Sequence, residues 1–157
     1  MKSIPKLIAC FVTCFGAGAI GGVFTAMSVN TAWYAQLIKP ALSPPGWVFA
    51  PVWNFLYLLM AISLYLVWVS DKTTDKRTAV SVFACQLLLN VAWSAAFFGL
   101  RSPVGAFFVI LLLLAAIIAT IYAFSRISAK SALLLTPYLA WVCFAGYLNY
   151  YLWILNR

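Results

Sequence analysis

Acidic residues are almost absent from this sequence, and histidine is absent altogether. The 157 residues include two acids, Asp71 and Asp75, both in the stretch DKTTDKR. Acid/base catalysis by side chains uses positioned carboxylates or imidazoles, and pumps and ion channels usually carry ionisable groups inside the membrane. The composition therefore argues against hydrolysis, proton-coupled transport and ion conduction, and it leaves aromatic, amide and hydroxyl groups to carry the function.

Cysteine is also scarce, and each cysteine lies in an apolar run. The four are Cys10, Cys14, Cys85 and Cys143. Cys10 and Cys14 share a helix face, but without histidine or a nearby acid they make a poor set of metal ligands. We therefore predict no metal site and interpret all four as buried small apolar residues.

Charge of either sign is rare, since 8% of the residues are charged and 66% are apolar. A soluble domain needs more polar surface than this. A hydrocarbon core of about 30 Å is crossed by about 20 helical residues, and five apolar runs reach that length: 7–29, 47–70, 78–100, 104–125 and 132–155. Alternation with period two is missing, which argues against a transmembrane barrel. We expect an all-α integral membrane bundle of five transmembrane helices forming a single domain, residues 1–157.

Lysine and arginine are distributed unevenly between the two sides of such a bundle. One side collects Lys2, Lys6, Lys72, Lys76, Arg77, Arg126 and Lys130, and the other has Lys39, Arg101 and Arg157. The richer side tends to stay in the cytoplasm, which predicts a cytoplasmic N-terminus. The formal charge of +8 then reflects topology and contact with anionic lipid rather than a nucleic-acid partner.

Three of the runs carry aromatic residues at helical spacing, two of them together with an amide. The stripes are Phe49, Trp53, Leu56 and Met60, with Tyr57 at the shoulder; Gln86, Asn90, Trp93 and Phe97; and Tyr138, Trp141, Ala145, Asn149 and Leu152. Residues three and four apart share a helix face. An amide facing lipid would lack hydrogen-bond partners, so Asn90 and Asn149 are expected to point inward.

Two interpretations of these stripes stay open. The amides can be interhelical contacts and the tryptophans core packing or an interfacial belt. Alternatively, the three stripes converge on a pocket for a flat apolar ligand with a few polar handles.

The segment between the first two runs is stiff and aromatic. Asn30 is expected to cap a short turn, TAWYAQLIK, that Pro40 ends, and Pro44 and Pro45 fix the backbone before Trp47. One interpretation is a lid over the pocket that bears Trp33, Tyr34 and Trp47. The other is a plain interfacial connector.

Small residues recur at four-residue spacing in two of the runs. They are Gly18 with Gly22, Ala92 with Ala96, and Ala95 with Gly99. Such pairs let helices approach closely, within one bundle or between subunits. A homodimer through residues 78–100 is a hypothesis from this pattern.

Three stretches together resemble the TspO/MBR family, the tryptophan-rich sensory proteins related to the mitochondrial translocator protein, or peripheral benzodiazepine receptor. They are WYAQLIKPALSPPGWVFAPVWNFLY, QLLLNVAWSAAFF and PYLAWVCFAGYLNYYLWILN, and the resemblance covers all five runs. It implies a five-helix bundle, commonly dimeric, in a bacterial cell membrane, with the first loop folded over a ligand pocket.

For function, the resemblance implies a receptor or sensor that binds tetrapyrroles such as protoporphyrin IX, with no tightly bound cofactor. It also implies binding of benzodiazepine and isoquinoline carboxamide drugs, and an uncertain enzymatic role in light- and oxygen-dependent porphyrin degradation. Passive transport of porphyrins or sterols is the alternative. The implied ligand-binding residues are Tyr34, Pro44, Phe49, Trp53, Tyr57, Asn90, Trp93, Ser94, Trp141 and Ala145, with Trp53 and Trp141 as the photochemical pair.

A sterol or other lipid is a further partner that the resemblance implies. The family's sterol pattern is matched by Leu148, Tyr151 and Arg157, but it is matched equally by Val29, Tyr34 and Lys39. Because the pattern arises so easily, it supports only a hypothesis.

Overall fold

The computed structural model describes residues 3–72 and 75–157. In chain order its helices are α1 (Ile4–Ser28), α2 (Ala32–Gln36), η1 (Gly46–Val48), α3 (Phe49–Trp68), α4 (Lys76–Ser94), η2 (Ala95–Gly99), α5 (Pro103–Ser125), α6 (Ala129–Leu134) and α7 (Thr136–Leu155). The 3-10 helix η1 continues into α3, and η2 is a π-helical end of α4. The all-α prediction is confirmed for the described residues, which contain no strand.

Within those residues, five helical segments are long and apolar enough to cross a membrane. They are Ile4–Ser28, Gly46–Trp68, Lys76–Gly99, Pro103–Ser125 and Ala129–Leu155. Each predicted boundary lies within three residues of the observed one. The expectation of an integral membrane bundle with five membrane-spanning helical segments is therefore confirmed.

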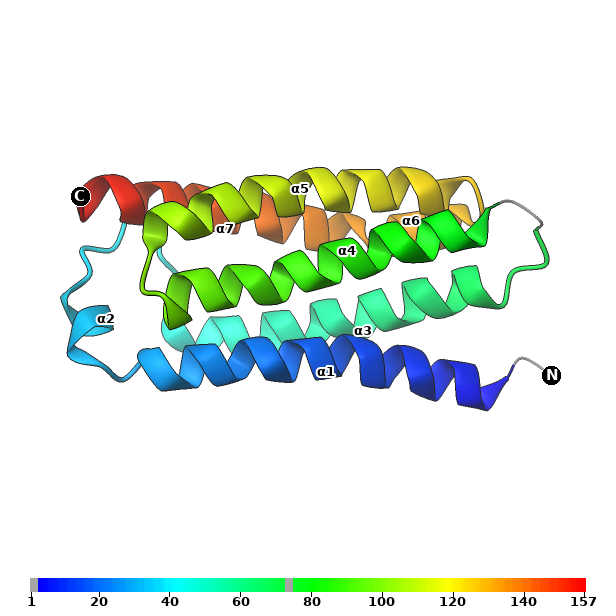
Figure 1. The fold of residues 1–157 in the computed structure, drawn as a ribbon, viewed down its shortest axis with the longest axis horizontal. Coiled ribbons are helices and arrows are strands. Elements are labelled where there is room, and N and C mark those ends of the chain that lie inside the picture. Colours follow the sequence, from blue (N-terminus) through cyan, green and yellow to red (C-terminus); the bar gives the residue numbers. More distant parts are fainter. Residues whose placement is uncertain (1–2, 73–74) are drawn as a thin grey trace.

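The spanning helices lie side by side in one bundle (Figure 1). α1 packs against α3 and α4, α4 against α5, and α5 against α7, while α3 packs against α6. Aromatic side chains link α3 to α7: the rings of Trp53 and Tyr138 are 6.3 Å apart, and those of Phe49 and Trp141 are 5.9 Å apart. The centre of the bundle thus lies between α1, α3, α4, α5 and α7.

The fifth span is broken between α6 and α7 at Leu135, where the sequence predicted one continuous helix. Pro137 lies in the first turn of α7 and has no N–H to donate to the preceding turn. The hydroxyl of Thr136 donates instead to the carbonyl of Leu133 at 2.8 Å. Proline therefore divides the span, and the neighbouring threonine satisfies one carbonyl that the break leaves open.

The amides point inward, as expected for polar groups in an apolar bundle. Asn90 is 3% exposed and Asn149 is 1% exposed. A reciprocal pair also joins α3 to α6, where the Ser63 hydroxyl donates to the Ser131 carbonyl at 2.8 Å and the Ser131 hydroxyl donates to the Ser63 carbonyl at 2.7 Å. Both of these buried hydroxyls have a partner, which offsets their removal from water.

The prediction that all four cysteines are buried is wrong for two of them. Cys10 and Cys14 are fully buried on α1, but Cys85 and Cys143 are exposed on the outer surfaces of α4 and α7. Position within an apolar run does not determine which face of the helix a residue occupies. No group of three or more metal-ligating side chains occurs among residues 3–72 and 75–157.

Basic residues gather at one end of the bundle. The start of α1, the end of α3, the start of α4 and the α5–α6 connection lie together at that end, and α2 and the C-terminus lie at the other (Figure 1). Of the residues that predicted the orientation, Lys2 lies outside the described part of the chain.

At the same end, Asp75 caps α4: the hydroxyl and the backbone N–H of Thr78 donate to its carboxylate and hold its pKa below the usual value.

Candidate functional site: an aromatic cavity beneath the first loop

A cavity of about 660 Å³ lies between α1, α3 and α4, beneath the segment that contains α2. We call it the main cavity. Its walls are formed by Phe15, Gly18, Ala19, Gly21, Gly22, Thr25, Ala26, Val29, Tyr34, Gly46, Phe49, Ala50, Trp53, Asn54, Tyr57, Asn90, Trp93, Ser94 and Phe98. Ligand cavities in proteins commonly measure about 300–1,000 Å³, so this space is of ligand size.

The wall contributed by α1 consists mainly of small residues. A Cβ added at Gly18 would lie 2.6 Å from Tyr57 Cε2, whereas one added at Gly22 would meet no described atom within 4 Å. Gly18 therefore gives α3 its close approach, and Gly22 leaves open space. Sequence reasoning attributed this spacing to helix packing alone, and it did not place α1 in the site.

The α3 wall is aromatic. The ring of Trp53 is stacked on that of Tyr57 with centroids 5.6 Å apart, and Phe49 lies one turn of helix nearer the loop. Flat side chains of this kind bury a large apolar area and favour stacking with other aromatic rings. The wall is suited to a flat aromatic ligand.

Two hydrogen-bonded groups fix the α4 wall. Trp93 Nε1 donates to Asn149 Oδ1 at 2.9 Å, and Asn149 Nδ2 donates to the carbonyl of Pro103 at 2.7 Å, which ties α4, α7 and α5 together. Deeper in the cavity, the Tyr57 hydroxyl donates to Asn90 Oδ1 at 2.7 Å. Trp93 is thus held as a rigid ring, while Tyr57 and Asn90 supply the polar part of the wall.

The loop above the cavity rests on the π-helical end of α4. Trp33 meets Phe97 and Tyr34 meets Phe98, each with ring centroids 5.9 Å apart. Burial raises the pKa of the Tyr34 hydroxyl. Trp47 was expected on the same lid, but it is 75% exposed and is not part of the cavity wall.

A second contact holds this loop at its far end. Asn156 Oδ1 accepts the backbone N–H of Ile38 at 2.8 Å, and Asn156 Nδ2 donates to the Ile38 carbonyl at 3.0 Å. Lys39 follows, with its Nζ 4.4 Å from the ring centroid of Tyr34.

The predicted cap at Asn30 is wrong, because Thr31 is the residue that precedes α2 and its hydroxyl donates back to the carbonyl of Ser28.

Most of the residues that the family resemblance implied do surround the main cavity. Those in its wall are Tyr34, Phe49, Trp53, Tyr57, Asn90, Trp93 and Ser94. Pro44, Trp141 and Ala145 are not among the lining residues. Trp141 packs behind Phe49 with ring centroids 5.9 Å apart, and Ala145 packs against the apolar core. Pro44 lies in the loop between α2 and η1.

The lining side chains of the main cavity are all uncharged. They combine stacked aromatic rings with a few amide and hydroxyl groups, so the cavity suits an apolar ligand that makes a small number of hydrogen bonds. Fold and cavity together define a helical membrane protein with a ligand-sized aromatic site closed at one end by a loop.

The chain belongs to the TspO/MBR family, whose sequence model matches residues 10–154. It is 41% identical to the tryptophan-rich protein TspO of Chlorobaculum tepidum over 156 residues, covering 99% of this chain and 98% of the relative. It is 43% identical to the translocator protein of Ovis aries over 127 residues, covering 80% of this chain and 75% of the relative. The tryptophan-rich sensory protein of Cereibacter sphaeroides is 32% identical over 144 residues, covering 92% and 87%.

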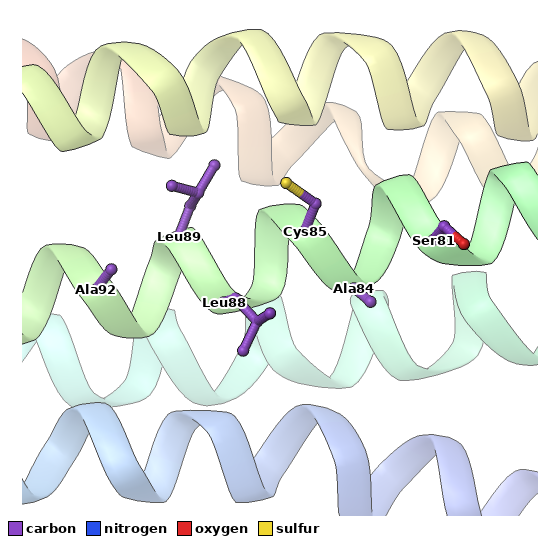
Figure 2. A pocket seen from close by; sticks show the side chains of 6 residues that line it. All are labelled: Ser81, Ala84, Cys85, Leu88, Leu89 and Ala92. Carbon is purple, nitrogen blue, oxygen red and sulfur yellow. The ribbon is translucent and has the colours of Figure 1, made fainter.

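A separate hollow of about 500 Å³ lies on the outer surface of α4. Figure 2 shows the side chains around it, all from this helix: Ser81, Ala84, Cys85, Leu88, Leu89 and Ala92. Small residues lie on either side of two consecutive leucines, so the surface is mainly apolar. We call it the α4 hollow.

Proposed function

We propose that the protein is a membrane receptor or sensor that binds tetrapyrroles, represented by protoporphyrin IX, in the main cavity. The observation that carries the proposal is the shape and chemistry of that cavity: about 660 Å³, uncharged, and walled by Phe49, Trp53 and Trp93. Rigid aromatic walls favour a flat conjugated ligand. Relatives named as sensory and translocator proteins support a role in ligand recognition.

Binding is tested by titrating the purified protein in detergent with protoporphyrin IX. We expect saturable quenching of tryptophan fluorescence, weakened in Trp53→Ala and unchanged in Trp68→Phe, which alters a tryptophan at the other end of α3. Ligand at about 100 times its dissociation constant should add about 2.7 kcal/mol to stability. Non-saturable quenching without thermal stabilisation would refute tetrapyrrole binding.

We propose further that the bound tetrapyrrole is degraded in light, with dioxygen as the oxidant. An indole against the photoexcited ring can donate an electron to it; the reduced ring passes that electron to dioxygen, and the oxidised indole takes one back from the tetrapyrrole. The net change is oxidation of the tetrapyrrole and reduction of dioxygen, and the photochemistry itself belongs to the ligand. Trp53 lines the cavity, whereas Trp141 is behind Phe49. Trp53 is therefore the principal candidate, and Trp141, which is separated from the cavity by Phe49, is the second.

Illumination tests this part of the proposal. Porphyrin absorbance is followed in air, under argon and in the dark, for the wild type, Trp53→Phe and Trp141→Phe. We expect oxygen-dependent loss that slows most in Trp53→Phe. Equal rates in all three proteins would remove the catalytic assignment and leave a receptor. Porphyrin flux into proteoliposomes above that of empty liposomes would instead favour the passive transporter.

The same cavity is proposed to take benzodiazepine and isoquinoline carboxamide drugs, whose aromatic rings match its walls. Competition with protoporphyrin IX is the direct measurement. A drug that binds without displacing the porphyrin would place its site elsewhere.

We also propose a homodimer through the α4 hollow, because small residues on an exposed helix face allow a second helix to approach closely. Cys85 lies in the hollow and Cys143 is exposed on α7, so the chain contains its own probes. Cross-linking in liposomes should join Cys85 to Cys85 in Cys143→Ser, and it should fail in Cys85→Ser. Monomer alone in both variants would refute this interface.

The cytoplasmic N-terminus and a bacterial cell membrane complete the proposal. The end that carries Lys6, Lys72 and Arg126 is the more basic one, which favours the cytoplasmic side. An impermeant maleimide added to intact cells should label Ser43→Cys and should not label Ser3→Cys.

A further inference from the structure

Four buried side chains form a continuous hydrogen-bonded relay from the main cavity into the centre of the bundle. The Tyr57 hydroxyl donates to Asn90 Oδ1 at 2.7 Å, and Asn90 Nδ2 donates to the Tyr138 oxygen at 3.0 Å. The Tyr138 hydroxyl in turn donates to Gln86 Oε1 at 2.9 Å. Tyr57, the most accessible member, is 7% exposed, so all four side chains are buried.

The two ends of the relay differ. Tyr57 and Asn90 line the main cavity, where a ligand can reach them. Gln86 lies at the other end, is 1% exposed, and its Nε2 is buried without a partner among the described residues. Buried donors without a partner are rare in folded proteins because they lose their hydrogen bonds to water.

Each link of the relay can run in either direction. A tyrosine hydroxyl both donates and accepts, and an amide carries a donor and an acceptor that exchange places when the group turns by 180°. If Gln86 and Asn90 both turn, Gln86 Nε2 donates to Tyr138, Tyr138 donates to Asn90, and Asn90 donates to Tyr57. The same three bonds are then made in reverse.

Reversal changes what the cavity offers a ligand. In the observed direction the Tyr57 hydrogen is engaged by Asn90, so its oxygen is only an acceptor. In the reversed direction the oxygen receives a hydrogen bond from Asn90, and the Tyr57 O–H becomes a free donor. The orphan at the other end becomes the Gln86 carbonyl, and an unsatisfied carbonyl is less rare than an unsatisfied N–H.

We propose that this relay sets the hydrogen-bonding polarity of the main cavity, with Gln86 and Tyr138 as positioning residues that do not touch the ligand. A ligand with a donor selects the observed direction, and a ligand with an acceptor selects the reversed one. The cavity therefore accepts flat aromatic molecules of both kinds. This inference rests on the proposed ligand site, but it does not depend on the ligand being a tetrapyrrole.

Three tricyclic compounds of nearly equal shape provide the probes: carbazole has an N–H donor, fluorenone has a carbonyl acceptor, and fluorene has neither. One hydrogen bond contributes about a fivefold gain in affinity. In the wild type we expect carbazole and fluorenone each to bind about fivefold more tightly than fluorene, measured by tryptophan quenching in detergent.

Gln86→Leu removes the acceptor at the buried end and leaves Tyr138 only Asn90 to donate to, which fixes the reversed direction. We expect carbazole to lose its advantage of about fivefold, while fluorenone keeps its own. In Tyr138→Phe the relay is cut, so adding Gln86→Leu to that variant should change neither affinity. Thermal unfolding of each variant checks that the bundle remains folded.

Three results would overturn the proposal. The first is a ratio of carbazole to fluorenone affinity that Gln86→Leu leaves unchanged, and the second is an equal change of this ratio when Gln86→Leu is added to Tyr138→Phe. The third is wild-type protein that binds carbazole and fluorenone no more tightly than fluorene. Titration of protoporphyrin IX into the same wild-type preparation distinguishes failure of the relay proposal from failure of the tetrapyrrole proposal. Porphyrin binding with an unchanged ratio refutes the relay alone. A changed ratio without porphyrin binding refutes the tetrapyrrole proposal alone.

Discussion

Replacing Gly18 with alanine should test whether the contact between α1 and α3 sets the shape of the main cavity. The new Cβ would lie 2.6 Å from Cε2 and 2.8 Å from Cδ2 of Tyr57. Carbon atoms in ordinary contact are about 3.5–4.0 Å apart. The ring therefore has to move by about 1 Å, although Trp53 stacks on it and its hydroxyl is bonded to Asn90.

The size of the effect follows from three contributions. Overpacking of a well-filled site costs about 1–3 kcal/mol, and loss of the bond from Tyr57 to Asn90 adds about 1 kcal/mol. Alanine is favoured over glycine inside a helix by about 1 kcal/mol, which offsets part of this. We expect Gly18→Ala to destabilise the protein by about 1–3 kcal/mol, since the opposing terms leave that difference.

The assay is thermal unfolding in detergent, with a control one turn along the same helix. Each kcal/mol shifts the midpoint by about 2–4 °C for a chain of this size. Gly22→Ala meets no described atom within 4 Å, so it should leave the midpoint unchanged or raise it. If the two variants unfolded at the same temperature, or if Gly18→Ala were the more stable, Tyr57 would not be held as the structure indicates.

Two further predictions concern the ends of the bundle. Asn156→Ala removes both hydrogen bonds to Ile38, so it should raise both the association rate and the dissociation rate of a cavity ligand, measured by stopped-flow fluorescence. Asn30→Ala, which changes another exposed asparagine, should change neither rate. Unaltered rates in Asn156→Ala would mean that the loop is held by its aromatic contacts. Hydrogen bonds from Thr78 lower the pKa of Asp75, so the stability that Asp75 contributes is present above its unfolded pKa of about 3.9 and is lost as the pH falls through its lower folded pKa. Asp75→Asn should therefore make the thermal unfolding midpoint less dependent on pH across that acid range. Parallel plots of midpoint against pH for wild type and variant would contradict the cap.

Hydropathy and helical spacing were sufficient to predict the spans and the inward-facing amides. Long apolar runs leave few alternatives to a helix in a membrane, and buried amides such as Asn90 and Asn149 need partners that only the interior offers. The break at Leu135 was missed because proline is tolerated in membrane helices. Pro137 therefore gave no certain sign that the helix would be divided.

Spacing alone could not decide which neighbouring helix each face meets. Tyr138 and Trp141 share one face of α7, yet Tyr138 enters the central relay while Trp141 packs behind Phe49. The orientation of α7 relative to α3 decides between these environments, and it depends on the packing of the whole bundle. For the same reason Cys85 and Cys143 were wrongly predicted to be buried.

The extent of the main cavity follows from side-chain size along successive turns of α1. At four-residue intervals the helix carries Cys10, Cys14, Gly18, Gly22 and Ala26. The two cysteines are fully buried in the apolar core, whereas the last three residues line the main cavity. A thiol fills the space beside its helix, and glycine leaves that space empty unless a neighbour enters it. Tyr57 enters beside Gly18 and none of the described residues enters beside Gly22, so the cavity ends where the tyrosine ring begins. The floor of the cavity is therefore the same ring whose hydroxyl begins the relay.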